Sequence, residues 1–141
     1  MEPTYDPHAD GSPDPGEVVW AWVPFEEDAT RGKDRPVVLL AREGNVWFAL
    51  AMTSKDHDRD VEQEAGEGRF WMDVGSGAWD TRGRPSEVRL DRLLRLDASS
   101  VRREGCALSP QVFEAVVLAA RPYLSGEADA PGKDGASPTA R

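Results

Sequence analysis

The chain has 141 residues and a formal net charge of −9, a length that suits one domain with a single hydrophobic core and is too short for two. Its acidity argues against nucleic acid as a partner, because binding to phosphates depends largely on Lys and Arg, although a local basic face can outweigh the sum. No apolar run approaches the roughly 18 to 20 residues of a membrane span, the acidic N-terminus does not resemble a secretory signal, and a single cysteine suits a reducing compartment, so we expect a cytoplasmic protein with no membrane association.

Both ends of the chain have the composition of disordered segments. Residues 1–14 are rich in Pro and contain four acids but no Lys or Arg, so they cannot bury enough apolar surface to order themselves. Residues 125–141 resemble them. The sequence therefore predicts a disordered acidic tail over 1–14, one ordered domain over 15–124 and a disordered C-terminal tail over 125–141.

The first half of the domain reads as three strands. Residues 17–23 (EVVWAWV) are β-branched and aromatic, which favours a strand. A polar loop separates them from the apolar run at 37–41 (VVLLA), which suits a strand covered on both sides. A turn at 43–45 then leads into a third strand at 46–53, predicted to form a hairpin with the second.

The second half continues with short strands and ends with a helix. An exposed loop is expected over the acidic residues 56–67, and strands are expected at 70–74, 86–90 and 93–96. Seven arginines against three acids between residues 82 and 103 leave a locally basic face possible. Ser109-Pro110 followed by apolar residues at helical spacing predicts one amphipathic helix that stops near Arg121, before Pro122. The pattern indicates a mainly β domain built as a small barrel.

Three motifs stand in order along this domain: PGEVVW at 15–20, GKDRPVVLL at 32–40 and AMTS at 51–54. Their order and spacing resemble the PemK/MazF toxin family of type II toxin-antitoxin systems. In that family a Gly-acid-aromatic strand opens the domain, a Gly-containing loop leads into an Arg-Pro-apolar strand, and a Thr ends the following strand. The resemblance implies a small SH3-like β-barrel with about five to seven short antiparallel strands and a C-terminal helix.

The resemblance also implies a function. It points to a growth-inhibiting toxin that acts as a metal-independent, sequence-specific endoribonuclease on single-stranded mRNA, leaving a 2',3'-cyclic phosphate and a 5'-hydroxyl. Its partners would be the RNA substrate and a cognate antitoxin protein that silences it, and no cofactor is implied. A homodimer is expected too, because a domain of this size with five Trp should leave apolar surface that needs a partner.

By the same resemblance, Arg35 and Thr53 are the catalytic residues. Attack of a 2'-hydroxyl on the adjacent phosphorus builds negative charge on the nonbridging oxygens, and a planar guanidinium suits that charge. Arg35 is a poor general base, because its pKa exceeds about 12. The Thr53 hydroxyl would hydrogen-bond the phosphate or orient the 2'-hydroxyl. The alternatives are a structural ion pair of Arg35 with Asp34 or Glu17 and an ordinary strand role for Thr53.

Loop residues beside this pair are candidates for holding RNA phosphates, with solvated loop side chains as the alternative: Arg31, Lys33, Ser54 and Lys55. Trp20 and Trp22 suit base stacking in principle, but Trp in a strand is more often part of a core or a dimer interface, and we assign them to packing. His57 has no second His or Cys at ligand spacing, so no metal site is expected. Cys106 is interpreted as a packing residue.

A second class of function remains open at this stage. The same barrel also serves gyrase-poisoning toxins, so the chain could be a non-catalytic interaction module, or a degenerate toxin that only binds a protein or nucleic-acid partner. Gyrase poisons act through residues of the C-terminal helix. In this chain the recognisable residues surround Arg35, which favours the ribonuclease.

Overall fold

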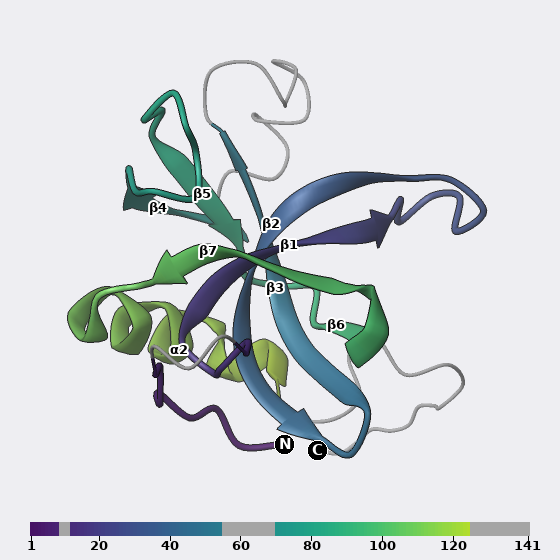
Figure 1. Cartoon of the computed structure of the whole chain (residues 1–141), viewed down its shortest axis with the longest axis horizontal. Helices are drawn as coiled ribbons and strands as arrows, with labels where there is room; N and C mark the ends of the chain where they lie inside the picture. The colour runs from purple at the N-terminus through teal and green to yellow at the C-terminus, as the bar shows by residue number, and fades with distance from the viewer. Residues whose placement is uncertain (9–11, 55–69, 125–141) are drawn as a thin grey trace.

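The computed structural model describes residues 1–8, 12–54 and 70–124, which form one curled antiparallel sheet and a C-terminal helix (Figure 1). The strands are β1 (Glu17–Pro24), β2 (Gly32–Glu43), β3 (Val46–Ser54), β4 (Trp71–Gly75), β5 (Ser86–Arg89), β6 (Leu94–Asp97) and β7 (Val101–Ala107). A 3-10 turn, η2 (Ala98–Ser100), precedes β7, and the helix is α2 (Pro110–Leu124). The mainly β fold predicted from the sequence is confirmed.

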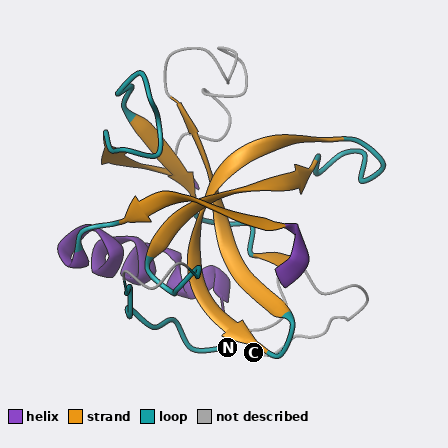
Figure 2. Ribbon diagram, viewed as in Figure 1, coloured by secondary structure: helices purple, strands orange, loops and turns teal. Residues whose placement is uncertain are grey.

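The sheet is built around β3. Its strands follow the order β4-β5-β3-β2-β1-β7, and β6 pairs with β3 off this path. β3 pairs with β6 through its first half and with β5 through its last three residues, so the sheet divides there. Figure 2 shows the strands crossing near the centre of the view and splaying apart toward its edges, with α2 along one side.

The β2–β3 hairpin predicted from the sequence is confirmed. Glu43 faces Val46 across a two-residue turn in which Gly44 has a φ of +61°, a conformation that glycine adopts at little cost. The register shifts between Leu39 and Ala41, and a bulge of this kind bends a strand and increases its twist.

Both faces of β2 are buried along its apolar run at 37–41, as that run predicted. Successive residues of β2 enter two different cores, because side chains alternate across a strand. One core lies against α2 and includes Val38, Leu40 and Phe113. The other lies on the opposite face and includes Val37, Leu39 and Trp47.

β7 is a strand that the sequence did not predict. Its sequence, VRREGCA, has none of the apolar alternation that marks a strand. It forms because it pairs antiparallel with β1, with Trp20 opposite Arg102 and Ala21 opposite Val101. Backbone hydrogen bonding to an existing strand edge is enough to define it.

The helix runs two residues beyond Pro122, rather than stopping before it, and ends at Leu124. Pro122 has no N–H to donate to the carbonyl of residue 118, and Leu118 is 73% exposed. Leu124 is buried and anchors the last turn. No helix among the described residues is long and apolar enough to cross a membrane.

Residues 1–8 differ from the disordered tail predicted over 1–14, because they form an arm that packs on the domain. The Thr4 N–H donates to the Leu40 carbonyl at 2.9 Å, beside the β2 bulge. The Tyr5 hydroxyl donates to the Leu108 carbonyl at 2.7 Å, and its ring lies 5.3 Å from that of Phe113. A Cβ on Gly16 would come within 2.6 Å of the Tyr5 ring. Two apolar side chains, Met1 and Tyr5, pack against the core. The polar composition of the segment as a whole gave no sign of this packing.

Candidate active site

Arg35 lies near the start of β2 and lines a cleft of about 210 Å³. The strand register brings residues far apart in sequence to this cleft, since β2, β3 and β5 are consecutive in the sheet. The cleft is lined by Val23, Pro24, Phe25, Glu26 and Glu27 at the end of β1 and in the following loop, by Arg35, by Ala51 and Met52 of β3, by Trp71 of β4, and by Arg89 and Arg92. Three arginines therefore converge on one cleft in an acidic protein.

Arg89, the last residue of β5, is held by contacts on two sides of its guanidinium. Its Nε and Nη2 donate to the two carboxylate oxygens of Asp91, the second at 3.2 Å. Its Nη1 lies 3.1 Å from Oε1 of Glu26. Its guanidinium also lies over the Trp71 ring, 5.9 Å from the centroid, a favourable arrangement for a cation. Arg89 is thus a preorganised positive group.

Arg89 keeps its positive charge despite its burial. Burial alone would lower the pKa of Arg89, but the carboxylates of Asp91 and Glu26 outweigh it and raise that pKa above its ordinary value. The guanidinium is therefore charged at any working pH. Arg35 and Arg92 are half-buried, so their charges too are only partly screened by water.

The alternative structural pairing of Arg35 with Asp34 or Glu17 receives little support. Asp34 and Arg35 are successive residues of β2, so their side chains leave opposite faces. Both carboxylate oxygens of Asp34 accept hydrogen bonds from Arg102, at 3.0 and 2.7 Å. Arg35 faces Ala21 in β1, four residues along that strand from Glu17.

Thr53 lies close to Arg35 in the strand register but does not line its cleft. Val37 faces Ala51 across β2 and β3, so the next positions on the same face are Arg35 and Thr53. Thr53 is 1% exposed, and its Cα partner on β5 is the buried Glu87. The register therefore places Arg35 and Thr53 next to each other, as predicted from the sequence. The two residues do not share an open cleft, because Thr53 is buried and does not line the cleft of Arg35.

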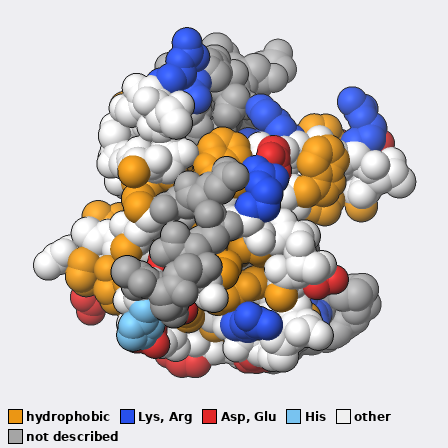
Figure 3. Space-filling view, in the orientation of Figure 1, with side chains coloured by type: hydrophobic (Ala, Val, Ile, Leu, Met, Phe, Trp, Pro, Cys, Tyr) orange, Lys and Arg blue, Asp and Glu red, His pale blue; other side chains and the backbone are white. Residues whose placement is uncertain are grey.

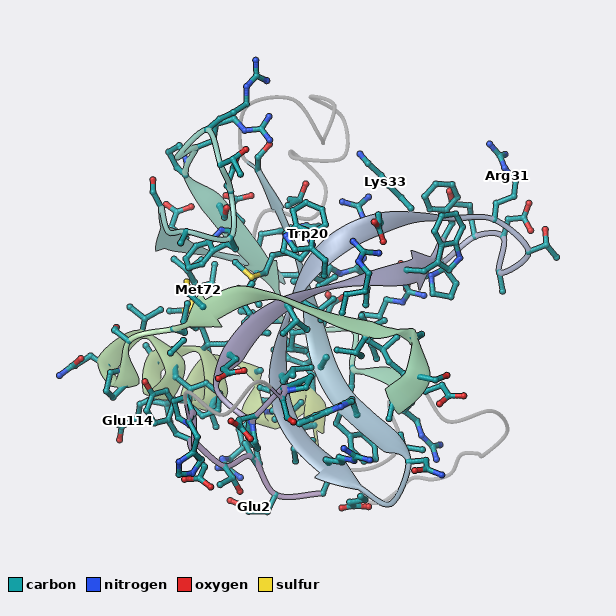
Figure 4. The ribbon with its side chains drawn as sticks, in the orientation of Figure 1. Glu2, Trp20, Arg31, Lys33, Met72 and Glu114 are labelled. Carbon is teal, nitrogen blue, oxygen red and sulfur yellow. The ribbon has the colours of Figure 1, made fainter. Side chains whose placement is uncertain are left out.

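Arg31 and Lys33 do not line the cleft. Figure 4 shows both side chains extending outward at the far end of the β1–β2 hairpin. Both are exposed, and the Arg31 guanidinium lies 5.8 Å from the centroid of the Phe25 ring. On the face of the molecule shown in Figure 3, Lys and Arg side chains gather over the upper half and Asp and Glu mostly along the lower edge.

Ser54 and Trp20 belong to a neighbouring region. Ser54 is buried and lines a small hollow with Trp20 and Trp79. Trp20 Nε1 donates to the Trp79 carbonyl at 3.2 Å, so Trp20 packs as predicted. Trp22 is 53% exposed, which differs from a core role, although its ring lies against Gly32.

Other candidate residues do not add to the site. Lys55, His57 and the acidic loop 56–67 lie outside the described residues. Cys106 is half-buried in β7. Within residues 1–8, 12–54 and 70–124, no three His, Cys, Asp or Glu side chains gather closely enough to hold a metal ion.

Five site residues have no signature in the sequence that marks them as such: Glu26, Trp71, Arg89, Asp91 and Arg92. The arginine-rich stretch from residue 82 to 103 was a signal for two of them, since it indicated a basic face without saying which arginines share it. The pairing of Glu26 with Arg89 joins residues 63 positions apart, and only the path of β1, β3 and β5 through the sheet brings them together.

Comparisons with known proteins agree with this fold. A family model described as PemK-like, MazF-like toxin of type II toxin-antitoxin system matches residues 14–124. Two crystal forms of MazE-MazF from Deinococcus radiodurans, Form-III and Form-II, are similar in structure, each with a TM-score of 0.52. They are 23% and 22% identical to this chain, and the matches cover 82% and 84% of it and 98% and 100% of theirs.

At 23% and 22% identity, the two structures support the fold alone. A search of curated proteins gave no match. The family model is the stronger finding, because it spans the whole described barrel, from the residues before β1 to the end of α2. The chain belongs to the PemK-like, MazF-like toxin family of type II toxin-antitoxin systems.

Proposed function

We propose that this toxin is a metal-independent endoribonuclease that cleaves single-stranded mRNA, with Arg35 as its principal catalytic residue. One observation carries the proposal: Arg35, Arg89 and Arg92 line a single cleft although the chain has a net charge of −9. Converging guanidinium groups are suited to the oxygens of a phosphodiester. Membership of the toxin family supports the same reading.

The chemistry follows from the charge that the reaction develops. The 2'-oxygen attacks the adjacent phosphorus and loses its proton, the bond from phosphorus to the 5'-oxygen breaks, and that oxygen gains a proton. The products are a 2',3'-cyclic phosphate and a 5'-hydroxyl. In the transition state the nonbridging oxygens carry more negative charge than in the substrate, so a guanidinium fixed beside them lowers the barrier.

Arg89 and Arg92 would neutralise the phosphate within the same cleft. Asp91 and Trp71 fix the guanidinium of Arg89 before any ligand arrives, so little conformational entropy is lost when it binds an anion. Arg31 and Lys33 would hold phosphates further along the RNA, since both are exposed at the end of the hairpin. Contacts of this kind position the RNA without reading its bases.

Thr53 remains the second catalytic residue of the proposal, with one condition. Because it is 1% exposed, its hydroxyl can reach a phosphate or a 2'-hydroxyl only if neighbouring side chains move when RNA binds. Ser54 is also buried and would need the same rearrangement to hold a phosphate. Lys55, which follows it, keeps its proposed phosphate contact on the resemblance alone.

The proposed partners follow the family. We expect a cognate antitoxin that silences the toxin, a role supported by the MazE-MazF composition of the two similar structures. We also expect a homodimer in the cytoplasm. The exposed Trp22, Leu118 and Tyr123 are apolar surface that a second copy could cover. Light scattering at tens of micromolar would give the mass, and a monomer would contradict this expectation.

Cleavage of a long RNA in EDTA tests the proposed function. Purified toxin should fragment the RNA without divalent metal. The new 3' ends should resist direct ligation until the cyclic phosphate is removed, and the new 5' ends should accept a phosphate from a kinase. Intact RNA, or ends of the opposite kind, would sink the ribonuclease proposal and favour a non-catalytic interaction module.

A further inference from the structure

We propose that Glu26 is an internal competitor for RNA, whose carboxylate occupies the cleft edge of the Arg89 guanidinium until a phosphate of the substrate displaces it. The inference rests on the proposed function for the identity of the displacing ligand. It assigns to Glu26 a regulatory role in the site, distinct from the roles of Arg35 and Thr53.

The three contacts of Arg89 divide into a fixed side and an exchangeable side. Asp91 engages Nε and Nη2 from the same stretch of chain and is 17% exposed, and Trp71 covers one face of the guanidinium. Glu26 engages Nη1 alone, from the loop that follows β1. Its side chain is 57% exposed, compared with 13% for Arg89. Glu26 is therefore the partner that can leave into water, while Asp91 still neutralises the buried Arg89 charge.

The position of Glu26 is where a phosphate would bind. Glu26 and Arg89 both line the cleft that also contains Arg35 and Arg92. A carboxylate oxygen 3.1 Å from Nη1 has the charge and geometry of a phosphate oxygen accepting the same hydrogen bond. Nη1 has two N–H donors, but two anions held side by side on one guanidinium repel each other, so a phosphate that binds Arg89 from the cleft competes with Glu26.

The strength of the pair permits this exchange. An ion pair with one well-exposed partner contributes little net free energy, because water and salt screen it. A phosphodiester bound by several arginines gains more contacts than Glu26 loses. The pair therefore reduces affinity for weak anions at Arg89 while allowing a correctly placed phosphate to enter.

The opposite role for Glu26 would be to hold Arg89 in position. In that case removing its charge would disorder the guanidinium and weaken anion binding. The contacts of Asp91 and Trp71 favour competition, since they remain when Glu26 leaves. The two roles predict opposite signs for one substitution, which makes the inference testable.

The experiment compares Glu26→Gln with Glu27→Gln. Gln keeps the shape of the side chain and removes its charge. Glu27 lines the same cleft, so its substitution changes the net charge equally but leaves the partner of Arg89 in place. Two probes are used: inorganic phosphate, followed through the Nε–H signal of Arg89 by NMR, and a fluorescent single-stranded 2'-O-methyl RNA, which cannot be cleaved, followed by anisotropy.

Glu26→Gln should bind phosphate about two- to five-fold more tightly than the wild type, the range expected from losing an exposed ion pair, and Glu27→Gln should gain less. The same order should hold for the 2'-O-methyl RNA. In an Arg89→Gln background the advantage of Glu26→Gln over Glu27→Gln should vanish. Equal gains from the two variants, or weaker binding by Glu26→Gln, would overturn the inference.

The phosphate measurement separates this inference from the proposed function. If the wild type does not cleave RNA and Glu26→Gln still gains phosphate affinity, the ribonuclease proposal fails and competition at Arg89 stands. If the wild type cleaves RNA and Glu26→Gln gains nothing over Glu27→Gln with either probe, competition by Glu26 fails and the ribonuclease proposal stands.

Discussion

Tyr5 should tie the N-terminal arm to the domain strongly enough to affect its unfolding. Its hydroxyl donates to the Leu108 carbonyl at 2.7 Å, and its ring contacts Phe113 of α2. Tyr5→Phe removes only the hydrogen bond, and Tyr5→Ala removes the ring as well. We predict that both variants lower the free energy of unfolding, the second more than the first.

The magnitudes follow from these two contacts. A typical intramolecular hydrogen bond contributes about 0.5 to 1.5 kcal/mol, which is the loss expected for Tyr5→Phe. An aromatic pair contributes about the same again, and burial of a half-exposed ring adds on the order of 1 kcal/mol. Tyr5→Ala should therefore cost about 2 to 4 kcal/mol.

Urea denaturation followed by tryptophan fluorescence measures these losses. Glu2→Ala is the matched control, because it changes the same arm at an exposed side chain whose ion pair with Arg121 is also exposed, so its effect should stay within about 0.5 kcal/mol. Tyr5→Ala unfolding at the same urea concentration as Glu2→Ala would refute the packed arm and restore the disordered tail predicted from the sequence.

Three further predictions concern charges and the site. Burial opposes ionisation of Asp80, yet hydrogen bonds from the Arg84 side chain and the Arg82 backbone hold its pKa below the ordinary value. Asp80→Asn should therefore destabilise the fold at pH 7 in thermal melts. The difference between the variant and the wild type should disappear as the pH falls below about 4. Arg89→Ala should reduce RNA cleavage at least about ten-fold in initial-rate assays, since it removes a fixed cleft cation. Thr53→Val, which keeps the buried volume, should reduce cleavage by no more than Arg35→Ala does, and the double variant should lose less than the two losses combined if both residues act on one phosphate. Three results would contradict these expectations. The first is a loss of stability for Asp80→Asn that does not depend on pH, and the second is a wild-type cleavage rate for Arg89→Ala. The third is a double variant at residues 35 and 53 whose loss of rate equals the two single losses combined.

The sequence predicted the elements whose patterning is local. The β1 and β2 strands, the hairpin to β3 and the start of α2 all follow from apolar periodicity and turn residues. β7 was missed because its pairing with β1 depends on the neighbouring strand rather than on its own side chains. The packed arm was missed because composition averages over Met1 and Tyr5, the two residues that make its apolar contacts.

Residues of the candidate site could likewise be predicted where they belong to a local motif, and not where only the fold brings them together. Arg35 was predicted from a contiguous motif, and its neighbour Thr53 from a second motif at the expected distance along the chain. Arg89 and its partner Glu26 were not, because an ion pair between β5 and the β1–β2 loop leaves no local pattern. The burial of Thr53 could not be predicted either, since it depends on how β5 packs beside β3.

Substitution of Arg35 tests the catalytic role most directly. Single-turnover cleavage of a short RNA should fall at least about 100-fold for Arg35→Ala, the size expected for losing a principal transition-state donor. Arg35→Lys should not restore full activity, because an ammonium lacks the forked donors of a guanidinium. A melting temperature close to that of the wild type would show that the loss of rate is not a loss of folding. Wild-type rates for Arg35→Ala, in a preparation free of other nucleases, would contradict the account.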